Sequence, residues 1–229
     1  MGDWVEVQGP DGAFKAYVAR PSGTPRGAVV AVQEIFGINA VMRGKADWLA
    51  REGFLAIAPD LFWRIKPGID ITDQTDAEWK EALGYMNQLD KNASVKDVQA
   101  TLTHARSIGA AKAGVMGYCM GGYIAFLAAC RTETDATVAY HGGGIHTALG
   151  EAGKIKKPVL LHNPMKDDFI PVAALDAIRE TLKPNPLVTI HEYADQGHAF
   201  TREGGAAYDE AAKQLADGRT IAFLKQTLA

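Results

Sequence analysis

Residues 113–122 read Ala-Gly-Val-Met-Gly-Tyr-Cys-Met-Gly-Gly and decide the fold. An apolar run leads into a cysteine framed by glycines, and a second apolar run follows it. The pattern predicts a buried strand over 114–116, a sharp turn at Cys119 and a helix over 120–130. Glycines suit such a turn, because neighbours without Cβ atoms let the strand and the helix approach closely. This is the G-x-S-x-G pattern of a nucleophile elbow, with cysteine in place of serine.

The same stretch has a second interpretation. Residues 113–130 carry no charge over eighteen positions, which reaches the lower limit for a membrane-spanning helix. Four glycines within the run favour a strand–turn–helix unit instead, and no membrane partner is expected. The chain starts without a basic segment followed by an apolar core, so we expect no signal peptide and a cytoplasmic location.

Strands and helices are expected to alternate on both sides of this unit. Strands are predicted over 14–19, at a sheet edge, and over 28–32, 54–58, 136–140, 158–162 and 187–193. Helices are predicted over 43–52, 73–89, 94–108 with Ser94 as the capping residue, 172–182 and 206–228. This alternation predicts an α/β fold, with a mostly parallel sheet covered by helices on both faces. The sequence contains no internal repeat and no long linker, so a single domain over residues 1–229 is expected.

Composition narrows the function classes. The 229 residues are 47% hydrophobic and 22% charged, the balance of an ordinary globular protein. A net charge of −3 without a basic cluster argues against nucleic acid as a partner. Two cysteines are too few for a disulfide framework and fit a reducing compartment. Ligand-type side chains do not cluster with metal-site spacing, so no metal or other cofactor is expected. A monomer or small homo-oligomer is expected.

Two interpretations of Cys119 stay open from the elbow alone. As a nucleophile, its thiolate would be stabilised by the N–H groups and the positive dipole end of the following helix. As a structural residue, it would be a small apolar side chain packed where strand meets helix. Cys130 lies on an apolar helix without glycine framing and is expected to be structural.

A nucleophile on such an elbow takes its acid and its histidine from later in the chain. Asp167 and Asp168 follow the predicted strand 158–162, and His198 follows the strand 187–193. These are carboxyl ends of predicted parallel strands, where open sheets bind ligands. A histidine there can accept and return the proton, and a carboxylate can fix its tautomer. Residue chemistry alone does not choose between the two aspartates.

Five other histidines compete with His198 for the role of base. His104 and His191 fall inside a helical and a strand pattern, so both are expected to be structural. His162 precedes the segment with the two aspartates and is placed to line the site. His141 opens a triple-glycine run after a strand and is expected in a pocket wall. His198 alone combines the expected chain order with a glycine-preceded turn, and is predicted to be the base.

Five motifs together resemble the dienelactone hydrolase (carboxymethylenebutenolidase-like) family. They are Gln33-Glu34-Ile35-Phe36-Gly37-Ile38-Asn39, Ala58-Pro59-Asp60-Leu61-Phe62, the Gly-Tyr-Cys-Met-Gly-Gly elbow, Asp167-Asp168-Phe169-Ile170-Pro171 and Gly197-His198-Ala199-Phe200. The resemblance covers most of the chain in the family's order and implies an α/β-hydrolase fold. It implies hydrolysis of small lactones or carboxylic esters through an acyl-enzyme, with Cys119, His198 and Asp167 as the catalytic triad.

The resemblance also assigns Glu34, whose counterpart in the family holds or deprotonates the cysteine when substrate enters. From the residues alone, a carboxylate bonded to nearby backbone N–H groups is the alternative. The backbone N–H groups of Ile35 and Met120 are expected to form the oxyanion hole, where each donor is worth about 3–4 kcal/mol at the transition state.

Substrate-binding residues follow from the same resemblance. Arg202 matches one of two arginines that hold a substrate carboxylate, the alternative being a solvated loop arginine. The second arginine has no counterpart in 73–85, so a dienelactone is one candidate beside other esters, lactones or thioesters. Tyr118, His141 and Phe36 are expected to line the site with Arg202. The competing hypothesis is a non-hydrolytic small-molecule binder or redox-sensing thiol protein on the same fold.

Overall fold

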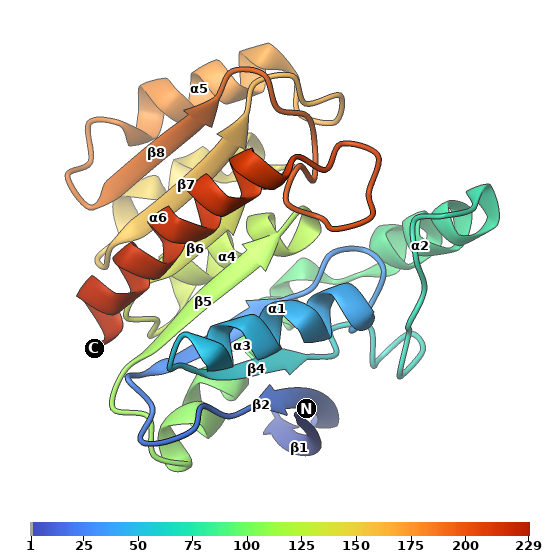
Figure 1. Ribbon diagram of the computed structural model, residues 1–229, viewed down its shortest axis with the longest axis vertical. Coiled ribbons are helices and arrows are strands. Elements are labelled where there is room, and N and C mark those ends of the chain that lie inside the picture. Colours follow the sequence, from blue (N-terminus) through green and yellow to red (C-terminus); the bar gives the residue numbers. More distant parts are fainter. Residues whose placement is uncertain (1) are drawn as a thin grey trace.

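A computed structural model describes residues 2–229, whose eight strands form one sheet in the order β1-β2-β4-β3-β5-β6-β7-β8 (Figure 1). The strands are β1 (Asp3–Gly9), β2 (Gly12–Ala19), β3 (Ala28–Val32), β4 (Leu55–Pro59), β5 (Ala113–Tyr118), β6 (Thr137–Tyr140), β7 (Val159–Pro164) and β8 (Val188–Tyr193). The helices are α1 (Ala40–Arg51), α2 (Asp76–Gln88), α3 (Lys91–Ser107), α4 (Met120–Arg131), the 3₁₀ helix η1 (Ile145–Lys154), α5 (Val172–Leu182) and α6 (Glu210–Leu228).

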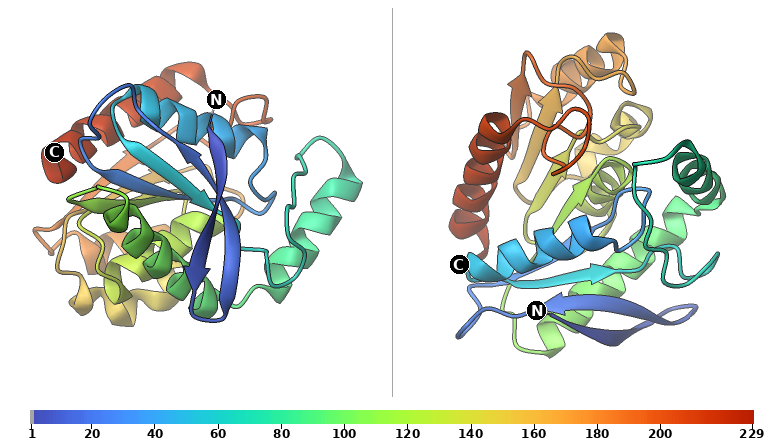
Figure 2. Two further views of the ribbon diagram at one scale, coloured as in Figure 1. Left: turned by 90° about the horizontal axis from the view of Figure 1, so that it is seen from below. Right: turned by 45° about the vertical axis from the view of Figure 1, so that its right-hand side comes forward.

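The sheet is parallel from β4 to β8, and a β1–β2 hairpin is added antiparallel to β4. Helices α1 and α6 cover one face, while α3, α4 and α5 cover the other (Figures 1 and 2). Parallel neighbours need a crossover connection, and those crossovers place helices on the faces of the sheet. The predicted α/β fold, mostly parallel and covered on both sides, is confirmed.

The central strands are buried along their whole length. All residues of β3, β4, β5, β6 and β7 are buried. In β3 and β4 this burial matches a continuous apolar run in the sequence, whereas β7 also buries the polar residues His162 and Asn163. The prediction of an edge strand over 14–19 is wrong, because β2 lies between β1 and β4. The edge strand on this side of the sheet is β1, where only Val7 is buried and the remaining residues are at least partly exposed, so its sequence lacks a strong apolar pattern.

The predicted cap of the helix over 94–108 is also wrong. The helix α3 begins at Lys91, and Asp90 caps it by accepting hydrogen bonds from the N–H groups of Asn92 and Ala93. Ser94 lies inside the first turn, where its hydroxyl donates to the carbonyl of Asp90 at 2.9 Å. Aspartate and serine cap helices about equally well, so local preference did not distinguish the two starts.

Helix α2 stands apart from the other helices. It projects beyond the carboxyl ends of the parallel strands, and Ala82 is its single buried residue (Figures 1 and 2). The uncharged run 113–130 is divided between β5 and α4. Among the helices of residues 2–229, none combines the length and the apolar character that a bilayer crossing requires.

Candidate active site

Cys119 sits on the sharp turn between β5 and α4. Its backbone has φ 54° and ψ −118°, a conformation that residues with a side chain rarely adopt. Its N–H lies 3.1 Å from both the carbonyl oxygen of Tyr140 and Nδ1 of His141. Because a strained backbone persists only when its surroundings hold it, these two acceptors help to fix the thiol at the end of the strand.

His198 and Asp167 lie beside the thiol. Nδ1 of His198 is 2.7 Å from Oδ2 of Asp167, and the other carboxylate oxygen accepts the N–H groups of Phe169 (2.8 Å) and Ile170 (3.1 Å). Burial opposes a charge on His198, but hydrogen bonds to Asp167 and Cys119 outweigh it and raise the pKa of His198 to about 10. Since Nδ1 faces the carboxylate, Nε2 is the nitrogen left for the thiol.

The raised pKa of His198 predicts a pH-dependent contribution to stability. An unfolded histidine loses its second ring proton at about pH 6.5. In the native state the imidazole of His198 keeps this proton up to about pH 10. This contribution is complete below the lower value and is lost as the pH rises through the upper one. We therefore expect the Tm advantage of the wild type over His198→Gln to shrink by several degrees between these limits in calorimetry. A constant difference would contradict the assignment.

The two neighbouring aspartates are separated by the fold. The side chain of Asp167 is fully buried against His198, whereas Asp168 is exposed. The backbone N–H groups two and three residues after Asp167 hold its carboxylate in this position. The geometry therefore pairs His198 with Asp167, the aspartate that the family resemblance indicates.

Arg202 and Glu34 form a buried ion pair near the thiol. Nε and Nη2 of Arg202 bond the two oxygens of Glu34 at 2.8 and 2.7 Å, and Nη1 bonds Asp73 at 2.8 Å. Arg202 is 8% exposed, so it is not a solvated loop arginine. Both oxygens of Glu34 are engaged by Arg202, and neither Cys119 nor a local backbone N–H holds this carboxylate in the structure.

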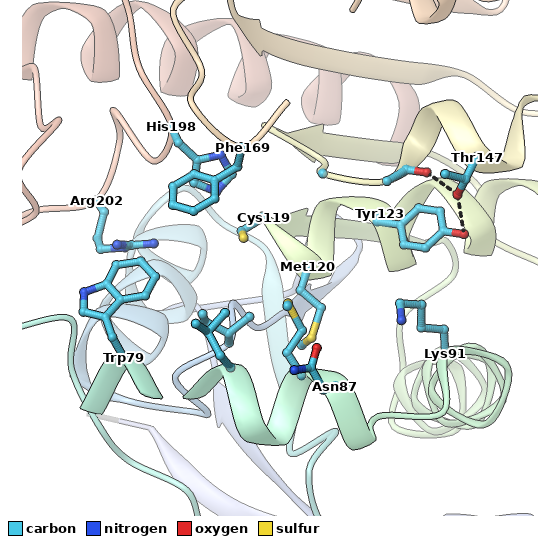
Figure 3. A pocket seen from close by; sticks show the side chains of 15 residues that line it. Trp79, Asn87, Lys91, Cys119, Met120, Tyr123, Thr147, Phe169, His198 and Arg202 are labelled. Carbon is cyan, nitrogen blue, oxygen red and sulfur yellow. Dashed lines mark hydrogen bonds between the residues drawn. The ribbon is translucent and has the colours of Figure 1, made fainter. Parts of the chain in front are cut away.

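A cavity of about 540 Å³ opens in front of Cys119 and His198 (Figure 3). Its walls come from the loop after β3, from α2, from the start of α3, from Cys119 and the first turn of α4, from η1 and the loop before it, and from the loops after β7 and β8. The residues around it are Ile35, Trp79, Leu83, Met86, Asn87, Lys91, Cys119, Met120, Tyr123, Gly143, Gly144, Thr147, Phe169, His198 and Arg202. Most of this surface is apolar, as is usual for small-molecule sites.

The two predicted oxyanion donors border this cavity. Ile35 follows the end of β3, and Met120 is the first residue of α4, where an N–H has no partner within its own helix. In the part of the chain that the structure describes, neither N–H donates a hydrogen bond. Both are free to bond an oxygen in the cavity.

Three predicted substrate-binding residues do not line the cavity. Tyr118 is 2% exposed and points to the opposite side of β5 from the cavity, where its ring lies 5.1 Å from the ammonium of Lys45. Phe36 is buried beneath the guanidinium of Arg202, and His141 is completely buried behind Cys119. These predictions are wrong for one reason. Sequence proximity to a site residue does not set the direction of a side chain. On β5 neighbours point to opposite faces, which turns Tyr118 away, and Phe36 and His141 lie in loops that turn inward.

His162 does not line the cavity either. It is fully buried, with its two ring nitrogens 2.7 Å from the Tyr193 hydroxyl and 2.9 Å from the Thr220 hydroxyl. Cys130 is buried as expected, and burial raises the pKa of its thiol to about 11. Neither residue takes part in the site.

The sequence analysis missed most of the cavity wall. Trp79, Leu83 and Met86 come from one side of α2 at helical spacing, a pattern that also fits a side packed in the core. Phe169 is 62% exposed, and its ring stacks on Trp79 at a centroid distance of 6.3 Å. The apolar spacing on α2 and the motif around Phe169 are both visible in the sequence. Neither distinguishes a residue that lines the cavity from one that packs in the core.

Comparison with known proteins identifies the family. The family model described as "Dienelactone hydrolase family" matches residues 14–228. The chain belongs to this family. A "Putative carboxymethylenebutenolidase" of Azospirillum brasilense is 44% identical over all of both chains. A "Carboxymethylenebutenolidase" of Pseudomonas putida is 35% identical over 98% of this chain and 96% of that protein.

A solved structure supports the same assignment. The crystal structure of a "Putative Dienelactone Hydrolase" from Klebsiella pneumoniae matches with a TM-score of 0.87 and 27% identity, covering 99% of this chain and 98% of that chain. This member of the dienelactone hydrolase family is therefore a hydrolase of esters or lactones, and its substrates are small molecules.

Proposed function

We propose that this chain hydrolyses small lactones or carboxylic esters through a covalent acyl-enzyme, with Cys119 as the nucleophile. The observation that carries the proposal is that Cys119 and His198 border the same cavity, while Nδ1 of His198 lies 2.7 Å from Asp167. A base in contact with the nucleophile and oriented by a third group is the arrangement that covalent catalysis requires.

The proposed reaction has two halves. Below about pH 10 His198 already carries on Nε2 the proton that the Cys119 thiol has given up, and the sulfur attacks the acyl carbon of the substrate. Collapse of the tetrahedral adduct breaks the C–O bond, and His198 returns the proton to the departing oxygen. Water then attacks the thioester, giving one proton to His198, which passes it to the sulfur as the carboxylic acid leaves. Asp167 keeps its hydrogen bond to Nδ1 throughout and stabilises the imidazolium.

The N–H groups of Ile35 and Met120 complete the proposed site. Both residues border the same cavity as Cys119, and their N–H groups are without acceptors among residues 2–229, so they are available to the oxyanion. Glu34 takes part in this scheme only after leaving Arg202, because both of its oxygens are bonded there. We therefore assign the first proton transfer to His198 in the resting arrangement.

Alkylation of the thiol tests this proposal. Titration of the Cys130→Ala protein with iodoacetamide should abolish turnover of p-nitrophenyl acetate in proportion to modification of Cys119, measured by mass spectrometry. Cys130 is removed because it is the second free thiol of the chain. Alkylation of Cys119 should also abolish turnover of every lactone, acyl ester and thioester that the enzyme hydrolyses, to the same extent. Activity that survives complete alkylation of Cys119 would remove it as the nucleophile, and a thiol protein without any ester turnover would refute hydrolysis.

A further inference from the structure

The main cavity differs in charge between its two ends. Figure 3 shows Arg202 and Trp79 at one end, Lys91 at the other, and Cys119 between them. The walls between the ends are mostly apolar, and burying a charged substrate group against them without a partner is costly. The charges at the two ends therefore decide where an ionic group of a substrate can lie.

The Arg202 end has no free positive charge. Nε, Nη1 and Nη2 of Arg202 each donate to a carboxylate, two to Glu34 and one to Asp73. One guanidinium and two carboxylates give this group a formal charge of −1. An adjoining hollow shares Trp79 with the main cavity and adds the carboxylate of Asp168. In the resting arrangement, with Glu34 and Asp73 both bonded to Arg202, an incoming anion would meet negative charge at this end.

Lys91 provides the opposite situation. It lies at the start of α3 and forms no hydrogen bond or ion pair with any residue in the described part of the chain, 2–229. The neighbouring carboxylate of Asp90 is held by the N–H groups of Asn92 and Ala93, at 2.8 and 3.1 Å. The side-chain amide of Asn87 borders the same end of the cavity and is also without a partner among these residues. An ammonium and an amide NH₂ are donors suited to a carboxylate.

We propose that Lys91 and Asn87 form a subsite for a carboxylate at the end of the substrate remote from the scissile bond. This inference rests on the proposed function and names its substrate class: esters or lactones in which an apolar chain separates the reacting carbonyl from an anionic group. Lys91 is half-buried beside an apolar wall, where its attraction for an anion is stronger than in open water. We expect the subsite to contribute about tenfold or more to kcat/KM for such substrates.

Two matched series of substrates test the subsite. The anionic series is the p-nitrophenyl monoesters of straight-chain dicarboxylic acids from succinate to suberate, and the neutral series is p-nitrophenyl alkanoates of equal chain length. Lys91→Met should lower kcat/KM for the best anionic ester about tenfold, mainly through KM, and should change the neutral series less than about twofold. Lys91→Arg should keep most of the anionic rate. Higher ionic strength should reduce the wild-type preference.

Lys96→Met is the matched control, because Lys96 is an exposed lysine of the same helix that borders a separate surface groove. It should leave both series unchanged. Equal losses of Lys91→Met on both series, or no loss on either, would overturn the subsite and leave the proposed hydrolysis standing. A wild type that hydrolyses neither series would instead count against the proposed function.

A binding measurement tests the subsite independently of turnover. Calorimetric titration of the Cys119→Ala protein with monomethyl adipate should give an affinity that Lys91→Met weakens about fivefold or more. Monomethyl adipate has one free carboxylate and one ester, so it can occupy both the subsite and the space before Cys119. Equal affinities with and without Lys91 would overturn the inference.

Discussion

Replacing Asp167 by asparagine is expected to lower kcat for ester hydrolysis by about 10³-fold or more, with little change in fold. The carboxylate lies 2.7 Å from Nδ1 of His198, and its hydrogen bond raises the pKa of this histidine against the effect of burial. An amide in its place can turn its NH₂ group toward Nδ1, which favours the wrong imidazole tautomer and leaves the imidazolium without a counter-charge. Steady-state kinetics with p-nitrophenyl acetate, together with a circular dichroism melt, measure the two effects separately.

Asp168→Asn is the matched control for this experiment. The same chemical change is made one residue along the chain, on an exposed side chain that does not contact His198. We expect kcat within about twofold of the wild type, since surface substitutions away from a site usually have small effects. Comparable losses in the two variants would show that the loop after β7, rather than the carboxylate of Asp167, matters for turnover. Loss in Asp168→Asn alone would assign the acid to the other aspartate.

Replacing Gly117 by alanine is expected to destabilise the native state by more than about 4 kcal/mol, enough to prevent accumulation of folded protein. A Cβ atom at this position would lie 2.0 Å from the backbone oxygen of Gly121 and 2.4 Å from its carbonyl carbon. These are backbone atoms of the first turn of α4, so relief requires β5 and α4 to separate at the elbow. Denaturant unfolding of purified protein, or the soluble yield if none folds, provides the measurement.

Gly218→Ala is the control for the glycine effect. Gly218 lies inside α6 with open space around its Cα, so a methyl group meets nothing within 4 Å. We expect a gain of about 0.5–1 kcal/mol in the free energy of unfolding, because alanine loses less conformational entropy in a helix than glycine. A Gly117→Ala protein as stable as the wild type would show that the elbow can open without cost and would weaken its role as a rigid support for Cys119.

The features that could be predicted from the sequence are those that depend on local pattern. The strand over 28–32 and the helix over 172–182 have the predicted bounds, because a fully apolar run and a strong helical period each have one stable arrangement. The edge position of 14–19 and the cap at Ser94 were predicted wrongly. The position of a strand in the sheet depends on partners that are distant in sequence. For the cap, Asp90 and Ser94 lie close together and have similar capping preferences, so local sequence does not choose between them.

The candidate site divides in the same way. Cys119 and His198 stand out in the sequence because a strained, glycine-framed turn and a loop at a strand end leave local signatures. Phe36, Tyr118 and His141 are close to these motifs but buried, whereas Trp79 and Lys91 carry no motif and border the cavity. Orientation relative to the cavity depends on how α2 and the loops pack, and no residue type encodes it.

The amino-acid sequence alone predicts an elbow with a thiol at its tip and an alternating α/β arrangement, and it shows the family that the chain resembles. The family motif already indicates Asp167 as the acid, and the fold places its carboxylate against His198. Tertiary structure alone decides that Arg202 is neutralised by Glu34 and Asp73. It also decides that Lys91 is left as the unpaired cation among the described residues that border the cavity. The physical reason is that strands and turns follow from interactions between near neighbours in sequence. Charge pairing can join side chains that are far apart in sequence, such as Glu34 and Arg202. Their distance in space is set only when the chain folds.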